Sequence, residues 1–285
     1  MSRRFRPPIP PLQTAQLLRQ AGLRPKKHLG QNFLQDPHLL EAIIQVAEIQ
    51  PTDWVLEIGP GLGSLTRYLA NAAQQVVAVE IDETLFPILE QVLAPWENVH
   101  LVRGDILRLS PADLIPQEGY LVVANIPYYI TSALIRHLLE APRRPRRIVL
   151  TVQKEVAERI CASAGEMNLL ALSVQVYGRP SIALRIPAGA FYPPPKVDSA
   201  VVRIDLYPQP LLPYERLDTF FRLIRAGFSQ KRKTLRNALS HGLGLRSSQA
   251  ENLLLRAGIA PDRRAETLTL EEWQKLLEEW EQAPT

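Results

Sequence analysis

Residues 54–66, WVLEIGPGLGSLT, decide the fold of this 285-residue chain. The first five residues, WVLEI, predict a buried strand, and SLTRYLANAA after the glycines predicts a helix. Between them, Gly59, Gly61 and Gly63 allow a sharp turn and the close approach of a ligand, and the helix that follows offers unpaired N–H donors. The segment therefore indicates a strand, a ligand-binding loop and a helix in succession.

Further apolar runs alternate with helical patterns on the C-terminal side of this segment. They are QVVAVEI (75–81), VHLVR (99–103), YLVVAN (120–125) and RIVLTVQ (147–153). This alternation predicts an α/β fold with a mostly parallel, Rossmann-like sheet covered by helices. After residue 165 the runs SVQVYG (173–178), SIALRI (181–186) and SAVVRIDLY (199–207) predict strands that follow one another, and therefore an antiparallel edge.

Two proline-rich stretches divide the chain. Residues 1–12 predict a flexible arm, and residues 14–22 a short helix closed by glycine. Residues 207–213, YPQPLLP, have the proline density of a linker, and only helical patterns follow them. We therefore expect an N-terminal arm and helix at 1–24, the α/β domain at 25–207 and a small all-helical domain at 208–285.

Composition limits the partner and the compartment. The net charge of +4 and an acid-free stretch from residue 1 to 35 with seven basic residues suit a polyanionic partner. The single cysteine, Cys161, excludes an internal disulfide and favours a reducing compartment. Because we find neither a membrane-spanning run nor a secretory signal, we expect a cytoplasmic protein without membrane contact. A transit peptide is the alternative for the Arg-rich start, but the start is poor in serine and rich in proline.

Acidic residues follow the next two strands. Glu80 ends the second strand and Asp105 follows the third, so both share the ligand-binding rim with the glycine loop. A carboxylate after strand two can accept two hydrogen bonds from ribose hydroxyls. The spacing GxGxG, preceded by Glu57, resembles the S-adenosylmethionine sites of Rossmann-like methyltransferases. A nicotinamide cofactor is the alternative, although dinucleotide enzymes carry GxGxxG. No metal site is predicted.

The fourth strand ends in Asn125-Ile126-Pro127-Tyr128, which resembles the (D/N)PPY element of amino methyltransferases. The exocyclic amine of adenine is a weak nucleophile because its lone pair is delocalised into the ring. The Asn125 side-chain oxygen and the Ile126 carbonyl could accept its two N–H protons and favour a pyramidal nitrogen. Tyr128 offers a face on which a base could stack, and Phe191, before three prolines, could form the other side of the clamp.

The order HLGQNFL, LEIGPGLG, VVAVEID, GDIL, NIPYYITS, PPPKVDSAVVR and FSQKRKTLRNAL resembles the ribosomal RNA small-subunit adenine dimethyltransferases, from about residue 26 to 280. The type member of this family is the kasugamycin-resistance enzyme. The resemblance implies dimethylation of N6 on two adjacent adenines, in a hairpin near the 3′ end of small-subunit ribosomal RNA, during ribosome biogenesis. It implies S-adenosylmethionine as cofactor, with contacts from Asn32, Leu34, Gly59, Gly61, Glu80, Ile81, Asp105, Ile106 and Asn125. We expect a monomer. The chain departs from the family at Asn168-Leu169-Leu170, where bacterial members more often carry a Tyr-Gly pair.

RNA binding is predicted on basic residues around the catalytic domain. A stacked adenine hides N6, so the base must be turned out at a cost of a few kcal/mol, and phosphate contacts must offset this cost. In a helix predicted at 217–239, an apolar stripe lies beside an arginine stripe. The predicted phosphate contacts are Lys26, Lys27, Arg222, Arg225, Lys231, Arg232, Lys233 and Arg236.

Four alternative functions stay open. The dimethyltransferase of large-subunit RNA that gives macrolide resistance shares QNF and NIPY, but the tail GIAPDRRAETLTLEEW (258–273) favours the small-subunit branch. A non-catalytic RNA-binding assembly or transcription factor would not need an intact NIPY. Glutamine-modifying enzymes typically carry NPPY, which Ile126 breaks. A DNA adenine methyltransferase would leave the C-terminal tail unexplained.

Overall fold

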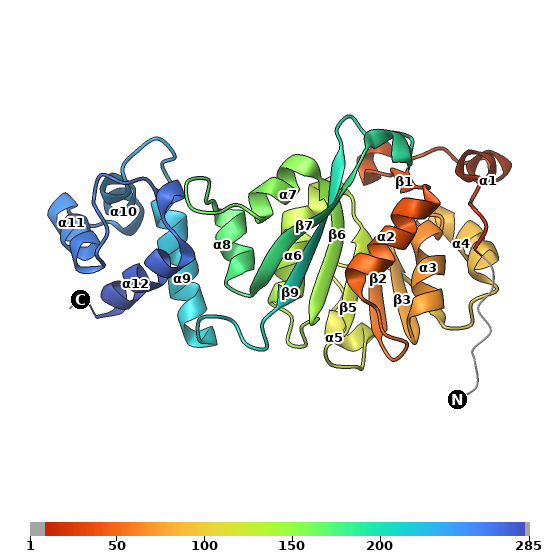
Figure 1. The fold of residues 1–285 in the computed structure, drawn as a ribbon, viewed down its shortest axis with the longest axis horizontal. Coiled ribbons are helices and arrows are strands. Elements are labelled where there is room, and N and C mark those ends of the chain that lie inside the picture. The colour runs from red at the N-terminus through yellow and green to blue at the C-terminus, as the bar shows by residue number, and fades with distance from the viewer. Residues whose placement is uncertain (1–8, 283–285) are drawn as a thin grey trace. The chain divides into compact units, whose positions relative to one another are not determined.

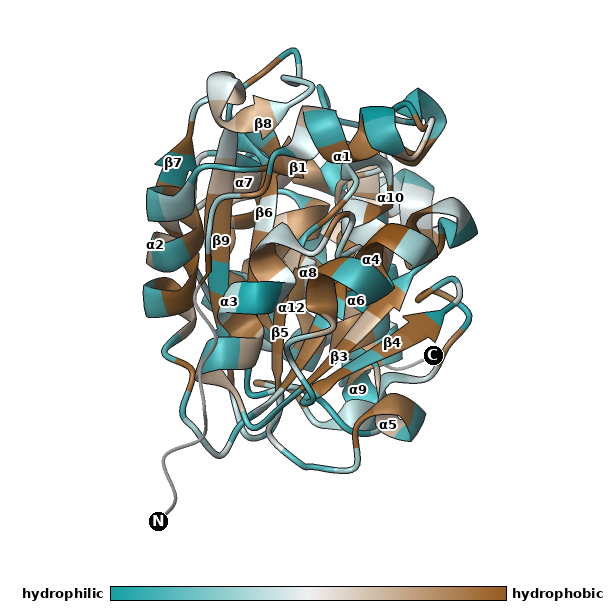
Figure 2. Cartoon of the chain, turned by 90° about the vertical axis from the view of Figure 1, so that its right-hand side faces the viewer, coloured by the Kyte–Doolittle hydropathy of each residue, from teal (hydrophilic) through white to brown (hydrophobic). Residues whose placement is uncertain are grey.

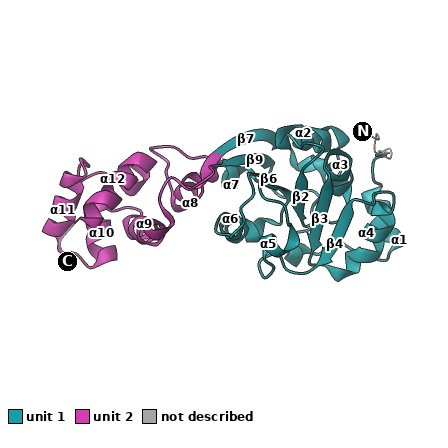
Figure 3. Cartoon of the chain, turned by 90° about the horizontal axis from the view of Figure 1, so that it is seen from below, with its two compact units in different colours: residues 1–157, 180–206 teal, residues 158–179, 207–285 magenta. Residues whose placement is uncertain are grey.

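The computed structural model describes residues 9–282 and divides the chain into two compact units (Figure 3). Unit 1 comprises residues 1–157 and 180–206, and unit 2 comprises residues 158–179 and 207–285. Unit 2 thus includes residues 158–179, which precede the predicted linker, as well as the helices that follow the linker. In residues 9–282, no helix is both long and apolar enough to cross a membrane.

The centre of unit 1 is a seven-stranded sheet in the order β4-β3-β2-β5-β6-β9-β7 (Figure 1). The strands are β2 (Trp54–Ile58), β3 (Gln75–Glu80), β4 (Val99–Arg103), β5 (Leu121–Asn125), β6 (Arg147–Gln153), β7 (Gly178–Ile186) and β9 (Ser199–Leu206). The strands from β4 to β6 are parallel, and β9 runs antiparallel to β6. The predicted Rossmann-like sheet with an antiparallel edge is therefore confirmed.

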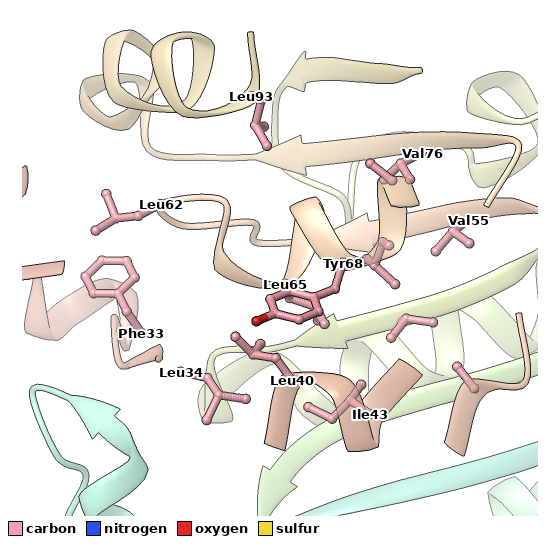
Figure 4. Packing of buried hydrophobic residues seen from close by; sticks show 14 of the residues in the cluster. Phe33, Leu34, Leu40, Ile43, Val55, Leu62, Leu65, Tyr68, Val76 and Leu93 are labelled. Carbon is pink, nitrogen blue, oxygen red and sulfur yellow. The ribbon is translucent and has the colours of Figure 1, made fainter. Parts of the chain in front are cut away.

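Helices cover both faces of this sheet, with α2 and α3 on one face and α5 and α6 on the other (Figure 3). Their bounds are α2 (Pro37–Ala47), α3 (Ser64–Ala72), α4 (Phe86–Leu93), α5 (Pro111–Leu114), α6 (Thr131–Leu139) and α7 (Lys154–Ile160). Because the sheet is covered on both sides, β3 and β5 are almost continuously hydrophobic (Figure 2). Leu40 and Ile43 of α2 and Leu65 of α3 pack with Val55 of β2 in the core (Figure 4).

The N-terminal segment lies against the core of unit 1. It contains α1 (Thr14–Gln20), the 3-10 turn η1 (Lys27–Leu29) and the short strand β1 (Phe33–Leu34), which pairs with β8 (Phe191–Tyr192). Residues 1–8 of the predicted arm lie outside the described residues. From residue 9 onward, part of the arm contacts the core of unit 1. Ile9 and Leu12 contact the core, and the buried Arg67 of α3 donates a 2.7 Å hydrogen bond to the Pro10 carbonyl.

Unit 2 is helical. Its helices are α8 (Leu169–Gln175), α9 (Tyr214–Gly227), α10 (Leu235–Leu243), α11 (Ser247–Arg256) and α12 (Leu270–Glu281). Helices α9 and α10 pack closely at Gly242 of α10, because a Cβ on this residue would lie 2.7 Å from the Cα of Ala226 in α9. Trp273 and Phe220 are fully buried, and Phe228 stacks on Trp273.

The remaining short turns of the chain are η2 (Glu83–Leu85), η3 (Tyr128–Ile130), η4 (Ala188–Ala190) and η5 (Ala265–Thr267).

Two predicted elements are wrong. Most of the expected strand at 173–178 belongs to or follows the helix α8, because the Asn168 side chain caps its N-terminus by accepting from the Ala171 N–H, 3.1 Å away. Asn168, where the chain departs from the family that it resembles, is thus a helix cap. The expected helix at 217–239 is broken at 228–234, between α9 and α10. The last residue of α9 is Gly227, where an added Cβ would clash with the Trp273 ring.

Candidate active site

A pocket opens at the carboxyl ends of β2, β3 and β5 in unit 1. Every predicted cofactor and catalytic residue except Phe191 lines it. These residues are Asn32, Leu34, Gly59, Gly61, Glu80, Ile81, Asp105, Ile106, Asn125, Ile126, Pro127 and Tyr128. Parallel strands bring their carboxyl ends to one edge, so residues far apart in the sequence meet there.

The glycine loop is shaped by its backbone and by a neighbouring side chain. Gly59 and Gly61 have φ values of 69° and 62°, in the left-handed region that glycine tolerates best. A Cβ on Gly61 would lie only 2.8 Å from the Phe33 ring, and Figure 4 shows Phe33 beside Leu62 of the same loop. Gly61 is therefore required for the packing of Phe33 on the loop as well as for the turn.

The Glu80 carboxylate is held in place by two backbone donors. Its Oε2 accepts from the Gly61 N–H at 3.1 Å, and its Oε1 accepts from the Asp82 N–H at 2.8 Å. Burial raises the pKa of Glu80, and these two hydrogen bonds counteract part of that rise. Each carboxylate oxygen has a second lone pair, so Glu80 can still accept hydrogen bonds from a ligand's hydroxyls.

Glu57 lies at the end of β2, next to Gly59, and is 1% exposed. Burial raises its pKa to about 8. Its Oε2 has no hydrogen-bond partner in the part of the chain that the structure describes. A buried polar atom without a partner is costly, so a ligand that forms a hydrogen bond with Glu57 would offset this cost.

The side-chain amide of Asn125 is oriented by a backbone carbonyl. Asn125 Nδ2 donates to the Asn32 carbonyl at 3.0 Å, and the Asn32 amide donates to the Gly30 carbonyl at 3.1 Å. Gly30 packs closely on Pro127, since a Cβ there would lie 3.1 Å from the Pro127 Cβ. Because Asn125 Nδ2 is bound to the Asn32 carbonyl, the amide is held in one orientation, and no group in residues 9–282 donates a hydrogen bond to its Oδ1.

Tyr128 and Phe191 occupy different positions. The Tyr128 hydroxyl is hydrogen-bonded to Ser199 Oγ at 2.8 Å; burial raises its pKa, and the Ser199 contact partly offsets the rise. Phe191 is 2% exposed on β8, where it pairs with Leu34 of β1. Tyr128 therefore lines the pocket and Phe191 does not, and the clamp with Phe191 stays a prediction.

Asp105, Ile81 and Ile106 form the opposite side of the pocket. Asp105 Oδ1 accepts from the Leu107 N–H at 3.0 Å, which shapes the loop after β4. Ile106 is buried, whereas Ile81 is 48% exposed at the rim.

Sequence reasoning missed four residues that line or support the pocket. Gln31 and Phe33 belong to the QNFL motif, and the prediction took only Asn32 and Leu34 from it. Asp82 follows Glu80 by two residues and supports it through its N–H. Tyr129 lines the pocket and is 61% exposed. The signal for Gln31 and Asp82 was their place inside matched motifs.

The predicted phosphate contacts have different surroundings. Three of them have partners within their own unit: Lys26 Nζ lies 2.7 Å from Asp82, Arg236 pairs with Glu251 at 3.3 Å, and Arg222 lies over the Trp280 ring. Lys27 is exposed in unit 1. We name the remaining four the loop cluster; all are exposed and unpaired among the described residues of unit 2. The loop cluster is Arg225, Lys231, Arg232 and Lys233.

Known proteins resemble the chain along almost its whole length. The family model described as ribosomal RNA adenine dimethylase matches residues 22–282. A protein of Dehalococcoides mccartyi (strain CBDB1), described as ribosomal RNA small subunit methyltransferase A, is 47% identical and covers 94% of this chain and 92% of its own length. A protein with the same description from Moorella thermoacetica (strain ATCC 39073 / JCM 9320) is 46% identical, with coverages of 93% and 96%.

Two solved structures resemble the chain over most of its length. The crystal structure of the 23S rRNA methyltransferase ErmE is 31% identical, with a TM-score of 0.73, and covers 88% of this chain and 100% of that one. That of a dimethyladenosine transferase from Plasmodium falciparum is 27% identical, with a TM-score of 0.76 and coverages of 87% and 97%. The family model spans far more than half of the sequence, and the resemblance seen in its motifs is confirmed. The chain belongs to the ribosomal RNA adenine dimethylase family.

Proposed function

We propose that this protein dimethylates N6 of two adjacent adenines in a hairpin near the 3′ end of small-subunit ribosomal RNA, with S-adenosylmethionine as methyl donor. The observation that carries the proposal is the oriented amide of Asn125, whose free Oδ1 stands at the tip of β5 beside the pocket. We further propose that it acts as a cytoplasmic monomer during assembly of the small subunit. The curated relatives, described as small-subunit methyltransferases, favour this RNA.

The pocket fits S-adenosylmethionine. Glu80 would accept hydrogen bonds from its ribose hydroxyls, and Ile81 and Asp105 would contact its adenine. Because Gly59 has no side chain, the cofactor could approach its backbone closely. The unpaired Oε2 of Glu57 would lie near the positively charged groups of the cofactor. When bound, the cofactor supplies an electrophilic methyl group on a sulfonium.

The residues at the tip of β5 would bind the adenine amine. Asn125 Oδ1 and the Ile126 carbonyl would each accept one N–H, which favours a pyramidal nitrogen with its lone pair available. Tyr128, held through Ser199, would stack on the base, a contact worth about 1–3 kcal/mol. No general base is required, because methylation makes the N6 proton acidic enough to leave to water.

RNA binding would use the loop cluster of unit 2 and Lys27 of unit 1. Their side chains are exposed and unpaired among the described residues, so forming phosphate contacts would break no ion pair. The domain division near residue 207 would then place most of the RNA contacts outside the catalytic domain, with Lys27 as a contact inside it. The release of counterions predicts a steep loss of RNA affinity with added salt.

The test is methyl transfer from labelled cofactor to purified small and large ribosomal subunits that lack the modification. We expect label in adenines of small-subunit RNA, identified as dimethyladenosine by mass mapping. Because ErmE is described as a 23S rRNA methyltransferase, the large-subunit RNA is the second candidate substrate. Label found only there would replace the proposal, and tight binding to small subunits without transfer would refute catalysis.

A further inference from the structure

Asp82 is a buried carboxylate outside the set of residues that the proposed reaction uses. Its side chain is only 2% exposed, yet it accepts from two residues of the N-terminal segment. Lys26 Nζ lies 2.7 Å from Oδ1, and Gln31 Nε2 lies 2.7 Å from Oδ2. Thr84 adds hydrogen bonds to Oδ1 from its N–H and its hydroxyl, at 3.1 and 2.6 Å.

These contacts keep Asp82 charged. Burial alone would raise its pKa, but the hydrogen bonds from Lys26, Thr84 and Gln31 outweigh burial and lower the pKa below its ordinary value. A buried carboxylate that is charged depends on its partners, because a buried charge left unpaired is strongly unfavourable. Lys26 and Gln31 are therefore held to Asp82 more firmly than surface residues would be.

Asp82 also connects two parts of the pocket. On one side, its N–H donates to Glu80 Oε1 at 2.8 Å, so the same loop positions the carboxylate proposed for the ribose. On the other side, Gln31 is followed directly by Asn32, whose carbonyl orients Asn125. Phe33 comes next and packs on Gly61 of the glycine loop.

We propose that Asp82 is a positioning residue that, through Lys26 and Gln31, holds residues 26–34 against the pocket. The inference rests on the proposed function. In this position the Asn32 carbonyl fixes the Asn125 amide, and Phe33 covers the glycine loop. Lys26 then serves the cofactor pocket and is not a phosphate contact, in contrast to the neighbouring Lys27, which has no partner in the described residues and is free to meet RNA.

The two adjacent lysines make a matched comparison. Lys26→Met and Lys27→Met each remove one positive charge at adjacent positions, but only Lys26→Met removes the contacts of Nζ with Asp82 and with Thr84 Oγ1, at 2.7 and 3.0 Å. The first measurement is the affinity for S-adenosylhomocysteine by calorimetry without RNA. We expect Lys26→Met to weaken it about tenfold, or about 1.4 kcal/mol, and Lys27→Met to leave it within about twofold. Lys26→Arg, which keeps the ion pair, should restore most of the affinity.

The second measurement is the KM for small subunits as a function of salt. Loss of a phosphate contact lowers the slope of log affinity against log salt by somewhat less than one. We expect that change for Lys27→Met and an unaltered slope for Lys26→Met. The double variant Lys26→Met/Asp82→Asn should bind S-adenosylhomocysteine no more weakly than the weaker single variant, because both remove one interaction.

Two results would overturn the inference. One is a Lys26→Met variant with unchanged S-adenosylhomocysteine affinity and a reduced salt slope, which would make Lys26 a phosphate contact. The other is additive loss in the double variant. If Asp82→Asn fails to fold, the lysine comparison still decides. Failure of the proposed function would look different, because the wild-type protein itself would then transfer no methyl group to the small subunit.

Discussion

The hydrogen bond from Asn125 to the Asn32 carbonyl makes Asn125→Asp the most informative substitution. The change is nearly isosteric, but it replaces the Nδ2 donor with a carboxylate oxygen at about the same place, 3.0 Å from the carbonyl oxygen. Two acceptors then face each other. The variant keeps an acceptor for the adenine amine and loses only the group that orients it.

The expected loss can be estimated from the contact. The missing hydrogen bond is worth about 0.5–1.5 kcal/mol, and a half-buried carbonyl left facing an acceptor adds about 1–3 kcal/mol. If the combined effect of about 1.5–4.5 kcal/mol falls on the oriented, reactive arrangement, turnover drops by about 10-fold to 2000-fold. Once protonated, the substituted carboxyl group can again donate to the Asn32 carbonyl. The activity of the variant relative to wild type should therefore rise as pH falls.

Single-turnover methyl transfer to small subunits, measured from about pH 6 to 8.5, tests this. Asn125→Ala is the matched control, because it lacks any titrating group and should lose at least about a hundredfold at every pH. S-adenosylhomocysteine affinity should fall less than turnover in both variants. Wild-type turnover by Asn125→Asp at about pH 8 would refute the orienting role of the Asn32 carbonyl.

Three further predictions concern the loop, the buried acid and RNA binding. Gly61→Ala should weaken S-adenosylhomocysteine binding, measured by calorimetry, about tenfold or more. The alanine would have to adopt a left-handed φ, which costs about 1–2 kcal/mol, and its Cβ would clash with the Phe33 ring. Gly189→Ala is the control and should leave the affinity unchanged, because its Cβ would lie in open space. The pKa of Glu57, about 8 in the folded protein against an ordinary value of 4.5, means that its contribution to stability is present below pH 4.5 and lost as pH rises through 8. The melting temperature of Glu57→Gln relative to wild type should therefore increase between about pH 5 and 8.5 without cofactor, and a constant difference would contradict the burial of a protonated acid. Alanine at all four positions of the loop cluster should raise the KM for small subunits and flatten its salt dependence by up to about 0.7–0.9 per lost contact, with unchanged S-adenosylhomocysteine affinity; an unaltered salt slope would remove the loop cluster from the RNA interface.

Two periodic patterns did not predict the elements that the structure contains. Residues 173–178 alternate like a strand, but Asn168 caps a helix that buries Ala171, Leu172 and Val174 at helical spacing. Residues 217–239 carry a continuous helical pattern, but the Trp273 ring from α12 packs at Gly227 and the helix ends there. The arginines expected on one stripe therefore lie on two helices and the loop between them.

The sequence by itself determined the sheet, the glycine loop and the chemistry at the tip of β5. Apolar runs, glycines and the NIPY segment determine structure through their neighbours in the chain, or through the edge at which parallel strands end. Their positions can therefore be predicted from local sequence. Only the tertiary structure decided the partner of each polar group. Whether Lys26 meets a phosphate or Asp82, 56 residues away, depends on which chain segments the fold brings together. Hydrogen bonds and ion pairs act over a few ångströms, and sequence spacing does not specify such distances.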